Sequence, residues 1–100
     1  MFKDLEELVK IIRERKNSSQ DKSYTNKLLN NKKLSAEKVK EEIEELLEAV
    51  KKNTNKIGES ADVLYHLLVY LEANEIKIED IIKELNKRKI RSGIEEKQNR

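Results

Sequence analysis

Four acidic residues in two short motifs are the side chains of this sequence best placed to do chemistry. Glu42 and Glu45 form a Glu-x-x-Glu motif, and Glu59 and Asp62 form a Glu-x-x-Asp motif thirteen residues further on. Carboxylates three residues apart on a helix project from adjacent turns and can share one cation, and Mg²⁺ prefers oxygen ligands. Two antiparallel helices would converge all four on a metal site that suits hydrolysis of a phosphoanhydride.

The second motif lies in the most apolar stretch of the chain, residues 57–71. Apolar residues surround this predicted helix on all sides, so we expect it to be largely buried. Burying Glu59 and Asp62 without a partner costs several kcal/mol each, so the sequence predicts a cationic group opposite them. The group is a metal ion on one interpretation and a Lys or Arg side chain on the other. His66 shares their face, where a lone His is more often a hydrogen-bonded core residue than a metal ligand.

The first motif has an ordinary interpretation as well. Glu42 and Glu45 lie on a Lys-rich helix, where such pairs usually form a solvated face. Lys38 lies on the same flank and would either contact a substrate phosphate or form an i,i+4 pair with Glu42. The segment with Tyr24, Thr25 and Lys27 offers the hydroxyls and the cation of a phosphate site, although such groups also occur together in surface loops.

Composition favours an all-α protein. The chain has 100 residues, no Pro and only two Gly, whereas β architectures need these residues for their turns. A formal charge of +2 does not indicate nucleic-acid binding. The absence of Cys excludes thiolate metal sites and is compatible with a cytoplasmic protein. Charged residues begin at Lys3, without a signal peptide, and the longest apolar run, residues 63–71, is too short to cross a bilayer.

Periodicity predicts four to five helices in an antiparallel bundle that dimerisation completes. The expected helices cover residues 2–16, 24–30, 35–53, 56–73 and 79–89. Ser23 and Ser35 are the expected N-caps. The helix from residue 35 should bury a stripe made of Val39, Ile43, Leu46, Leu47 and Val50. The last helix should cap the core through Ile81, Ile82 and Leu85, and residues 92–100 form a polar, frayed tail after a domain at 1–91.

The order of the motifs resembles the phosphoribosyl-ATP pyrophosphohydrolase family, within the all-α nucleotide pyrophosphohydrolases. The resemblance rests on these segments: Ser23-Tyr24-Thr25-x-Lys27-Leu28-Leu29, Lys38-Val39-x-Glu41-Glu42-x-x-Glu45, Glu59-Ser60-Ala61-Asp62-Val63-Leu64-Tyr65-His66 and Glu84-Leu85-x-x-Arg88. The resemblance implies Mg²⁺-dependent cleavage of phosphoribosyl-ATP to phosphoribosyl-AMP and pyrophosphate, the second step of histidine biosynthesis. It also implies a homodimer.

The resemblance also implies roles for individual residues. The implied metal ligands are Glu42, Glu45, Glu59 and Asp62. Glu41, or a ligand carboxylate such as Glu45, would orient or deprotonate the attacking water. The implied substrate-binding residues are Lys38, Tyr24, Thr25, Lys27 and His66.

Two departures from the family pattern concern loops. Lys40 replaces a usual Gly before the paired Glu, and the segment 30–33 lacks a usual Gly. A relative that hydrolyses non-standard nucleoside triphosphates would share the same acidic motifs, so it is the alternative within the superfamily. A non-catalytic helical dimerisation module is the alternative of another class, and it predicts that Glu59 and Asp62 tolerate replacement by amides.

Overall fold

The computed structural model describes residues 2–19 and 23–90, and within them the protein is all-α, without strands. It contains five helices: α1 (Lys3–Arg15), α2 (Tyr24–Leu29), α3 (Lys32–Lys52), α4 (Lys56–Ala73) and α5 (Ile78–Ile90). The predicted fold class is therefore confirmed. None of these helices is long and apolar enough to cross a membrane. The predicted tail at 92–100 lies outside the described residues.

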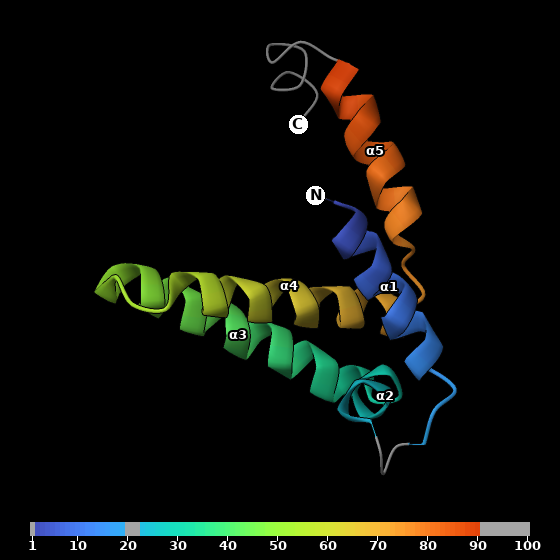
Figure 1. Cartoon of the computed structure of the whole chain (residues 1–100), viewed down its shortest axis with the longest axis horizontal. Helices are drawn as coiled ribbons and strands as arrows, with labels where there is room; N and C mark the ends of the chain where they lie inside the picture. Colours follow the sequence, from blue (N-terminus) through green and yellow to red (C-terminus); the bar gives the residue numbers. More distant parts are fainter. Residues whose placement is uncertain (1, 20–22, 91–100) are drawn as a thin grey trace.

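The α3–α4 hairpin is the frame of the molecule (Figure 1), and its two helices run antiparallel side by side. Asn53 and Asn55 have positive φ angles of 56° and 42°, a conformation that Asn tolerates better than most residues. The amide of Thr54 donates to the carbonyl of Ala49 at 2.9 Å, which closes the end of α3. This tight turn fixes which residues of α3 lie opposite which residues of α4.

The start of α3 differs from the prediction, which placed the N-cap at Ser35. Asn31 is the N-cap, and its Oδ1 accepts a hydrogen bond from the amide of Leu34 at 3.0 Å. Ser35 instead lies buried inside the helix. The prediction was wrong because Asn and Ser cap equally well, and the Lys-Lys-Leu segment between them is a good helix former. Ser23 was predicted correctly as the N-cap of α2 and accepts from the amide of Asn26 at 3.1 Å.

The core is small and lies where α1 and α2 pack on the end of the hairpin. Its buried residues are Val9, Ile12, Leu28, Leu29, Leu68, Val69 and Ala73. The predicted stripe of α3 is not part of it, since Ile43, Leu47 and Val50 are 42%, 66% and 56% exposed. The expectation that α4 is largely buried was also wrong, because its N-terminal half extends beyond α1 and α2. These two helices cover only one face of the hairpin and leave the opposite face bare.

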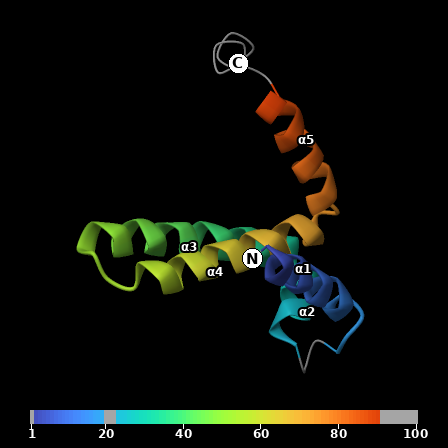
Figure 2. The same ribbon diagram turned by 45° about the horizontal axis from the view of Figure 1, so that its top comes forward.

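The last helix does not cap the core as predicted. Figures 1 and 2 show α5 projecting away from the hairpin, with Ile82 and Leu85 exposed and only Ile78 packed against the core. Arg13 of α1 holds the first turn of α5 in place. Its guanidinium donates to Glu72 of α4 at 2.9 Å and to both oxygens of Glu79 at 2.6 and 2.8 Å.

The Arg13 contact has a pH dependence. Its hydrogen bonds to the carboxylate lower the pKa of Glu79 from 4.5 to about 2. The folded-state pKa lies below the unfolded value, so this contact stabilises the protein above about pH 4.5 and is lost as the pH falls towards 2.

Asn26 joins α1 to α2. Its side chain is 2% exposed, and its Nδ2 donates to the carbonyl oxygens of Arg15 and Lys16 at 2.7 and 2.9 Å. These carbonyls belong to the C-terminal turn of α1, where the helix itself offers no donors. Asn26 therefore fixes the end of α1 beside the first turn of α2.

We expect Asn26→Ala to lower the free energy of unfolding by about 1–3 kcal/mol, because the partly buried hydrogen bonds to Arg15 and Lys16 are lost. Urea denaturation followed by circular dichroism measures the effect at one fixed protein concentration. Asn17→Ala, at an exposed position, is the control and should change stability by less than about 0.5 kcal/mol. Equal stability of the two variants would contradict the role assigned to Asn26.

Candidate metal centre

Three carboxylates from the two helices of the hairpin converge. Glu42 and Glu45 of α3 and Glu59 of α4 each place an oxygen within 4.8 Å of the other two. Glu45 comes before the turn on α3 and Glu59 comes after it on α4, so the antiparallel pairing of the two helices brings these residues opposite each other. The prediction that facing helices converge their acids is confirmed for these three residues.

Asp62 lies beside this group but is not one of the three. Its charge raises the pKa of both Glu42 and Glu59, which places its carboxylate near each of them. The residue as a whole is exposed. Its role as a fourth metal ligand therefore stays a prediction.

The centre is electrostatically unfavourable without a cation. Burial raises the pKa of Glu42 first, and the neighbouring Glu45 raises it further. Burial and then the charge of Glu45 raise the pKa of Glu59 in the same direction. One buried oxygen of each, Oε2, has no hydrogen-bond donor among the described residues. These shifts have a common cause, namely negative charges held close together and partly withdrawn from water.

The predicted Lys or Arg partner is not found. Within residues 2–19 and 23–90, no ion pair involves any of the three converging carboxylates. Lys38 pairs with Glu41 at 3.5 Å. The sequence had predicted either a substrate phosphate or Glu42 as the partner of Lys38. An all-oxygen donor set on a fixed frame instead fits a hard divalent cation. Glu42, Glu45 and Glu59 would hold it.

A polar cluster from α2 and α4 borders the carboxylates. The hydroxyls of Thr25 and Tyr65 are hydrogen bonded to each other, which ties α2 to α4. The ring of His66 packs edge-on against Tyr65 and Tyr24, with centroid distances of 5.0 and 6.2 Å. No role was predicted for Tyr65, although a Tyr in an apolar helix usually needs a partner for its hydroxyl.

The expected substrate-binding residues differ in their exposure. Tyr24 is 50% exposed, Lys27 is exposed, and His66 is only 9% exposed. Lys38 lies close enough to Tyr24 and Glu42 for both to raise the pKa of its ammonium, after the larger effect of Glu41. Tyr24, Lys38 and His66 therefore form the side of the centre that faces α2. Their contacts with a substrate remain predictions.

Fold and site together define an all-α protein with three carboxylates that converge on one side of a helical hairpin and could hold a divalent cation. Comparison with known proteins assigns the family: residues 5–89 match the phosphoribosyl-ATP pyrophosphohydrolase family, and the chain belongs to it.

Named relatives agree. A phosphoribosyl-ATP pyrophosphatase of Paracoccus denitrificans is 46% identical over 99 residues, covering 96% of this chain and 92% of the relative. One from Roseobacter denitrificans is 43% identical, covering 96% and 94%. A chloroplastic bifunctional histidine-biosynthesis protein of Arabidopsis thaliana is 43% identical over 81 residues, which are 78% of this chain but 29% of that protein.

Repulsion in the centre predicts the effect of neutralising one carboxylate. The pKa of Glu42 is raised in the folded state, so ionising this carboxyl is more costly in the folded protein than in the unfolded one. The stability that its protonated form gives is present below its ordinary pKa of 4.5 and is lost as the pH rises above that value. We expect Glu42→Gln to raise the melting temperature of the metal-free protein at pH 7, and the gain to shrink towards pH 4. Thermal denaturation in chelator measures it.

The matched control is Glu37→Gln, at an exposed position of the same helix outside the converging group, which should leave the melting temperature unchanged. Added Mg²⁺ should stabilise the unaltered protein more than Glu42→Gln. A lower melting temperature of metal-free Glu42→Gln at pH 7 would contradict the account of the centre.

Proposed function

We propose that this protein hydrolyses phosphoribosyl-ATP to phosphoribosyl-AMP and pyrophosphate in a reaction that depends on Mg²⁺. The observation that carries the proposal is the group of Glu42, Glu45 and Glu59, converged within 4.8 Å on the hairpin of a chain that belongs to this family. The names of the relatives support the substrate, because the bacterial ones are called phosphoribosyl-ATP pyrophosphatases and the plant one is assigned to histidine biosynthesis.

The side chains divide the reaction between them. A divalent cation on the carboxylates would polarise the phosphoanhydride, neutralise charge on the departing pyrophosphate and lower the pKa of a water molecule. Glu41, which Lys38 holds at 3.5 Å, or Glu45 would accept the proton of the attacking water. The water oxygen bonds to phosphorus as the phosphoanhydride bond breaks. Asp62 would serve as a further ligand of the cation.

The phosphates of the substrate would lie on the α2 side of the centre. Lys38 supplies a cation there, and Tyr24 and Lys27 are exposed near the start of α2. The hydroxyl of Thr25 is already bonded to Tyr65, so we propose that it positions α2 and contacts phosphate only with its remaining capacity.

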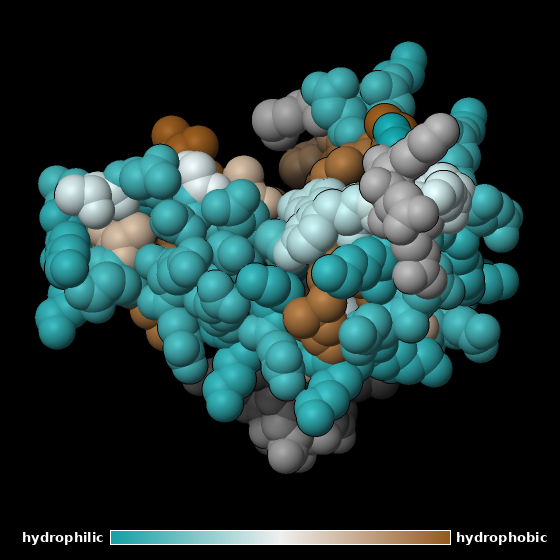
Figure 3. Space-filling model, turned by 90° about the horizontal axis from the view of Figure 1, so that it is seen from below, coloured by the Kyte–Doolittle hydropathy of each residue, from teal (hydrophilic) through white to brown (hydrophobic). Residues whose placement is uncertain are grey.

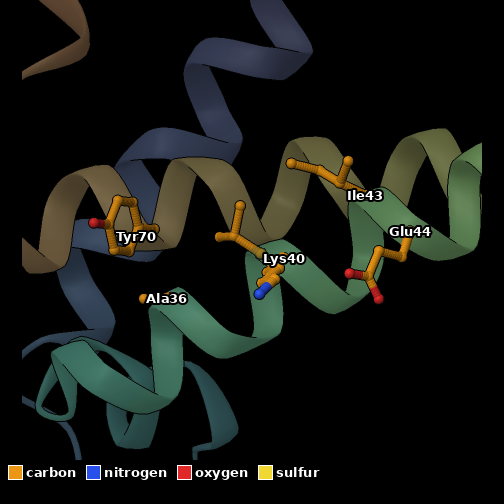
Figure 4. Close-up of a pocket in the computed structure, with 6 residues that line it drawn as sticks. Ala36, Lys40, Ile43, Glu44 and Tyr70 are labelled. Carbon is orange, nitrogen blue, oxygen red and sulfur yellow. The ribbon is translucent and has the colours of Figure 1, made fainter.

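We also propose that the protein is a homodimer that pairs the bare faces of two hairpins. Ile43, Leu47 and Val50 follow one another at helical spacing along this face of α3, and all are more than 40% exposed. A groove of about 380 Å³ lies on the same face, lined by Ala36, Val39, Lys40, Ile43, Glu44 and Tyr70. Figure 4 shows Ile43 and Tyr70 among its labelled side chains. Brown apolar patches interrupt the charged surface in Figure 3. A second copy offers an identical apolar face, whereas monomers rarely leave so much apolar surface in water.

Activity provides the direct test. We expect release of pyrophosphate from phosphoribosyl-ATP that requires Mg²⁺, and a loss of about 100-fold or more in kcat/KM for Glu59→Gln, exceeding the usual effect of an outer-sphere substitution. Glu37→Gln, at an exposed position of α3 outside the centre, is the control and should retain full activity. A panel of nucleoside triphosphates is assayed in parallel.

Selective turnover of a nucleoside triphosphate would contradict phosphoribosyl-ATP as the substrate. It would favour the alternative function, hydrolysis of non-standard nucleoside triphosphates. Folded protein that hydrolyses none of these compounds would contradict the enzyme assignment and favour an interaction module.

The dimer has its own test. Leu47→Lys places a charge on the bare face, and we expect it to weaken self-association about 30-fold or more, the effect of an important interface residue. Sedimentation equilibrium over a range of concentrations measures the dissociation constant. Glu37→Gln changes the net charge by the same amount at another exposed position and should leave it unchanged. Monomeric unaltered protein at micromolar concentration would contradict this interface.

A further inference from the structure

His66 is the only histidine of the chain and has one well-defined hydrogen bond. Its Nδ1 lies 2.8 Å from the main-chain oxygen of Asp62, one turn earlier on α4. A carbonyl oxygen can only accept, so Nδ1 carries the proton and donates it. In the neutral imidazole the proton is then absent from Nε2, which becomes an acceptor with a free lone pair.

The Nε2 atom is buried and has no hydrogen-bond partner among the described residues. Leaving a buried polar group unpaired is costly and uncommon in folded proteins. The rings of Tyr65 and Tyr24 pack edge-on against the imidazole, so they do not satisfy it. None of the residues in 2–19 and 23–90 supplies the donor that this atom needs.

The position of His66 indicates where that donor lies. His66 follows Asp62 by one turn on α4, on the face that carries Glu59, and Glu59 converges with Glu42. A charge on His66 would lower the pKa of Glu42, which agrees with this placement. The Oε2 atoms of Glu42 and Glu59 are buried and unpaired as well. All of these atoms accept hydrogen bonds when the acids are ionised, so they cannot satisfy one another.

We propose that Nε2 of His66 accepts a hydrogen bond from a water molecule that also donates to Glu42, and that His66 is thereby a positioning residue for water in the carboxylate centre. The inference rests on the proposed function and deepens it. A water molecule fits because it carries two protons for two acceptors. Ionised phosphate oxygens carry none, so the neutral imidazole binds this water and not a substrate phosphate.

The consequence for chemistry is orientation. A water molecule that gives both protons to Nε2 and to the carboxylate has its oxygen lone pairs directed away from these two groups. Those lone pairs are what a cation or an electrophilic phosphorus needs. The hydrogen bond from Nδ1 to Asp62 serves this role by fixing the tautomer, as outer-sphere partners of metal sites commonly do.

Nuclear magnetic resonance of the ring nitrogens tests the first step without interference from other histidines. At about pH 8, where a free imidazole is neutral, we expect Nδ1 to be protonated and Nε2 to be unprotonated. Addition of Mg²⁺ should shift the Nε2 resonance as the water becomes ordered, and leave Nδ1 nearly unchanged. A proton on Nε2, or an Nε2 resonance that ignores saturating Mg²⁺, would overturn the proposal.

Two substitutions separate positioning of water from packing. His66→Gln keeps an acceptor near Nε2, whereas His66→Asn keeps only a donor near Nδ1 for Asp62. We expect the affinity for Mn²⁺, measured by electron paramagnetic resonance, to stay close to that of the unaltered protein in the Gln variant. It should fall about 10–100-fold in the Asn variant. A purely structural His66 predicts the reverse order.

Circular dichroism establishes that each variant is folded, and the resonance test on the unaltered protein holds even if one is not. Neither readout uses phosphoribosyl-ATP, so failure of this inference leaves the proposed hydrolysis standing. Conversely, the expected resonances and metal affinities in a protein that hydrolyses nothing would sustain the water site and remove only the proposed function.

Discussion

Repulsion among carboxylates that the hairpin forces together is the constraint on which the site depends. The turn at Asn53 and Asn55 sets the register of α3 and α4, and this register places Glu59 beside Glu42 and Glu45. Each acid raises the free energy of its neighbours, and burial adds to this cost. Under the proposed function, a cation bound by these carboxylates would turn the repulsion into attraction, and the metal-free protein is less stable for holding them together.

The stability of the frame comes from the other end of the hairpin. There α1 and α2 form the small core, Asn26 joins them, and Arg13 connects α1 to the end of α4 and to the start of α5. The packing that stabilises the fold thus lies at one end of the hairpin, and the carboxylates that repel one another lie away from that end. The polar cluster of α2, with Tyr24 and Thr25, is the link between the two regions, because α2 contributes both to the core and to the border of the carboxylates.

Local patterns predicted the helices well and the packing poorly. Periodicity predicted the bounds of α4, and the i,i+3 spacing of the acids predicted the convergence seen for Glu42, Glu45 and Glu59. The sequence did not predict the bare face, because an apolar stripe that stays exposed looks the same in sequence as one that faces the core. The N-cap of α3 was predicted at Ser35 and lies at Asn31, because Asn and Ser are equally good capping residues. Thr25 and Tyr65 are 40 residues apart in the sequence, and local periodicity and spacing do not predict a contact between residues so far apart.

The most direct test of the central claim is the position of a bound cation. A crystal structure of the protein with Mn²⁺, with anomalous scattering to locate the metal, should place a peak about 2.0–2.3 Å from oxygens of Glu42, Glu45 and Glu59, distances typical of small divalent ions on carboxylates. A peak held by other residues, or carboxylates that turn apart into solvent with saturating Mn²⁺ present, would contradict the account.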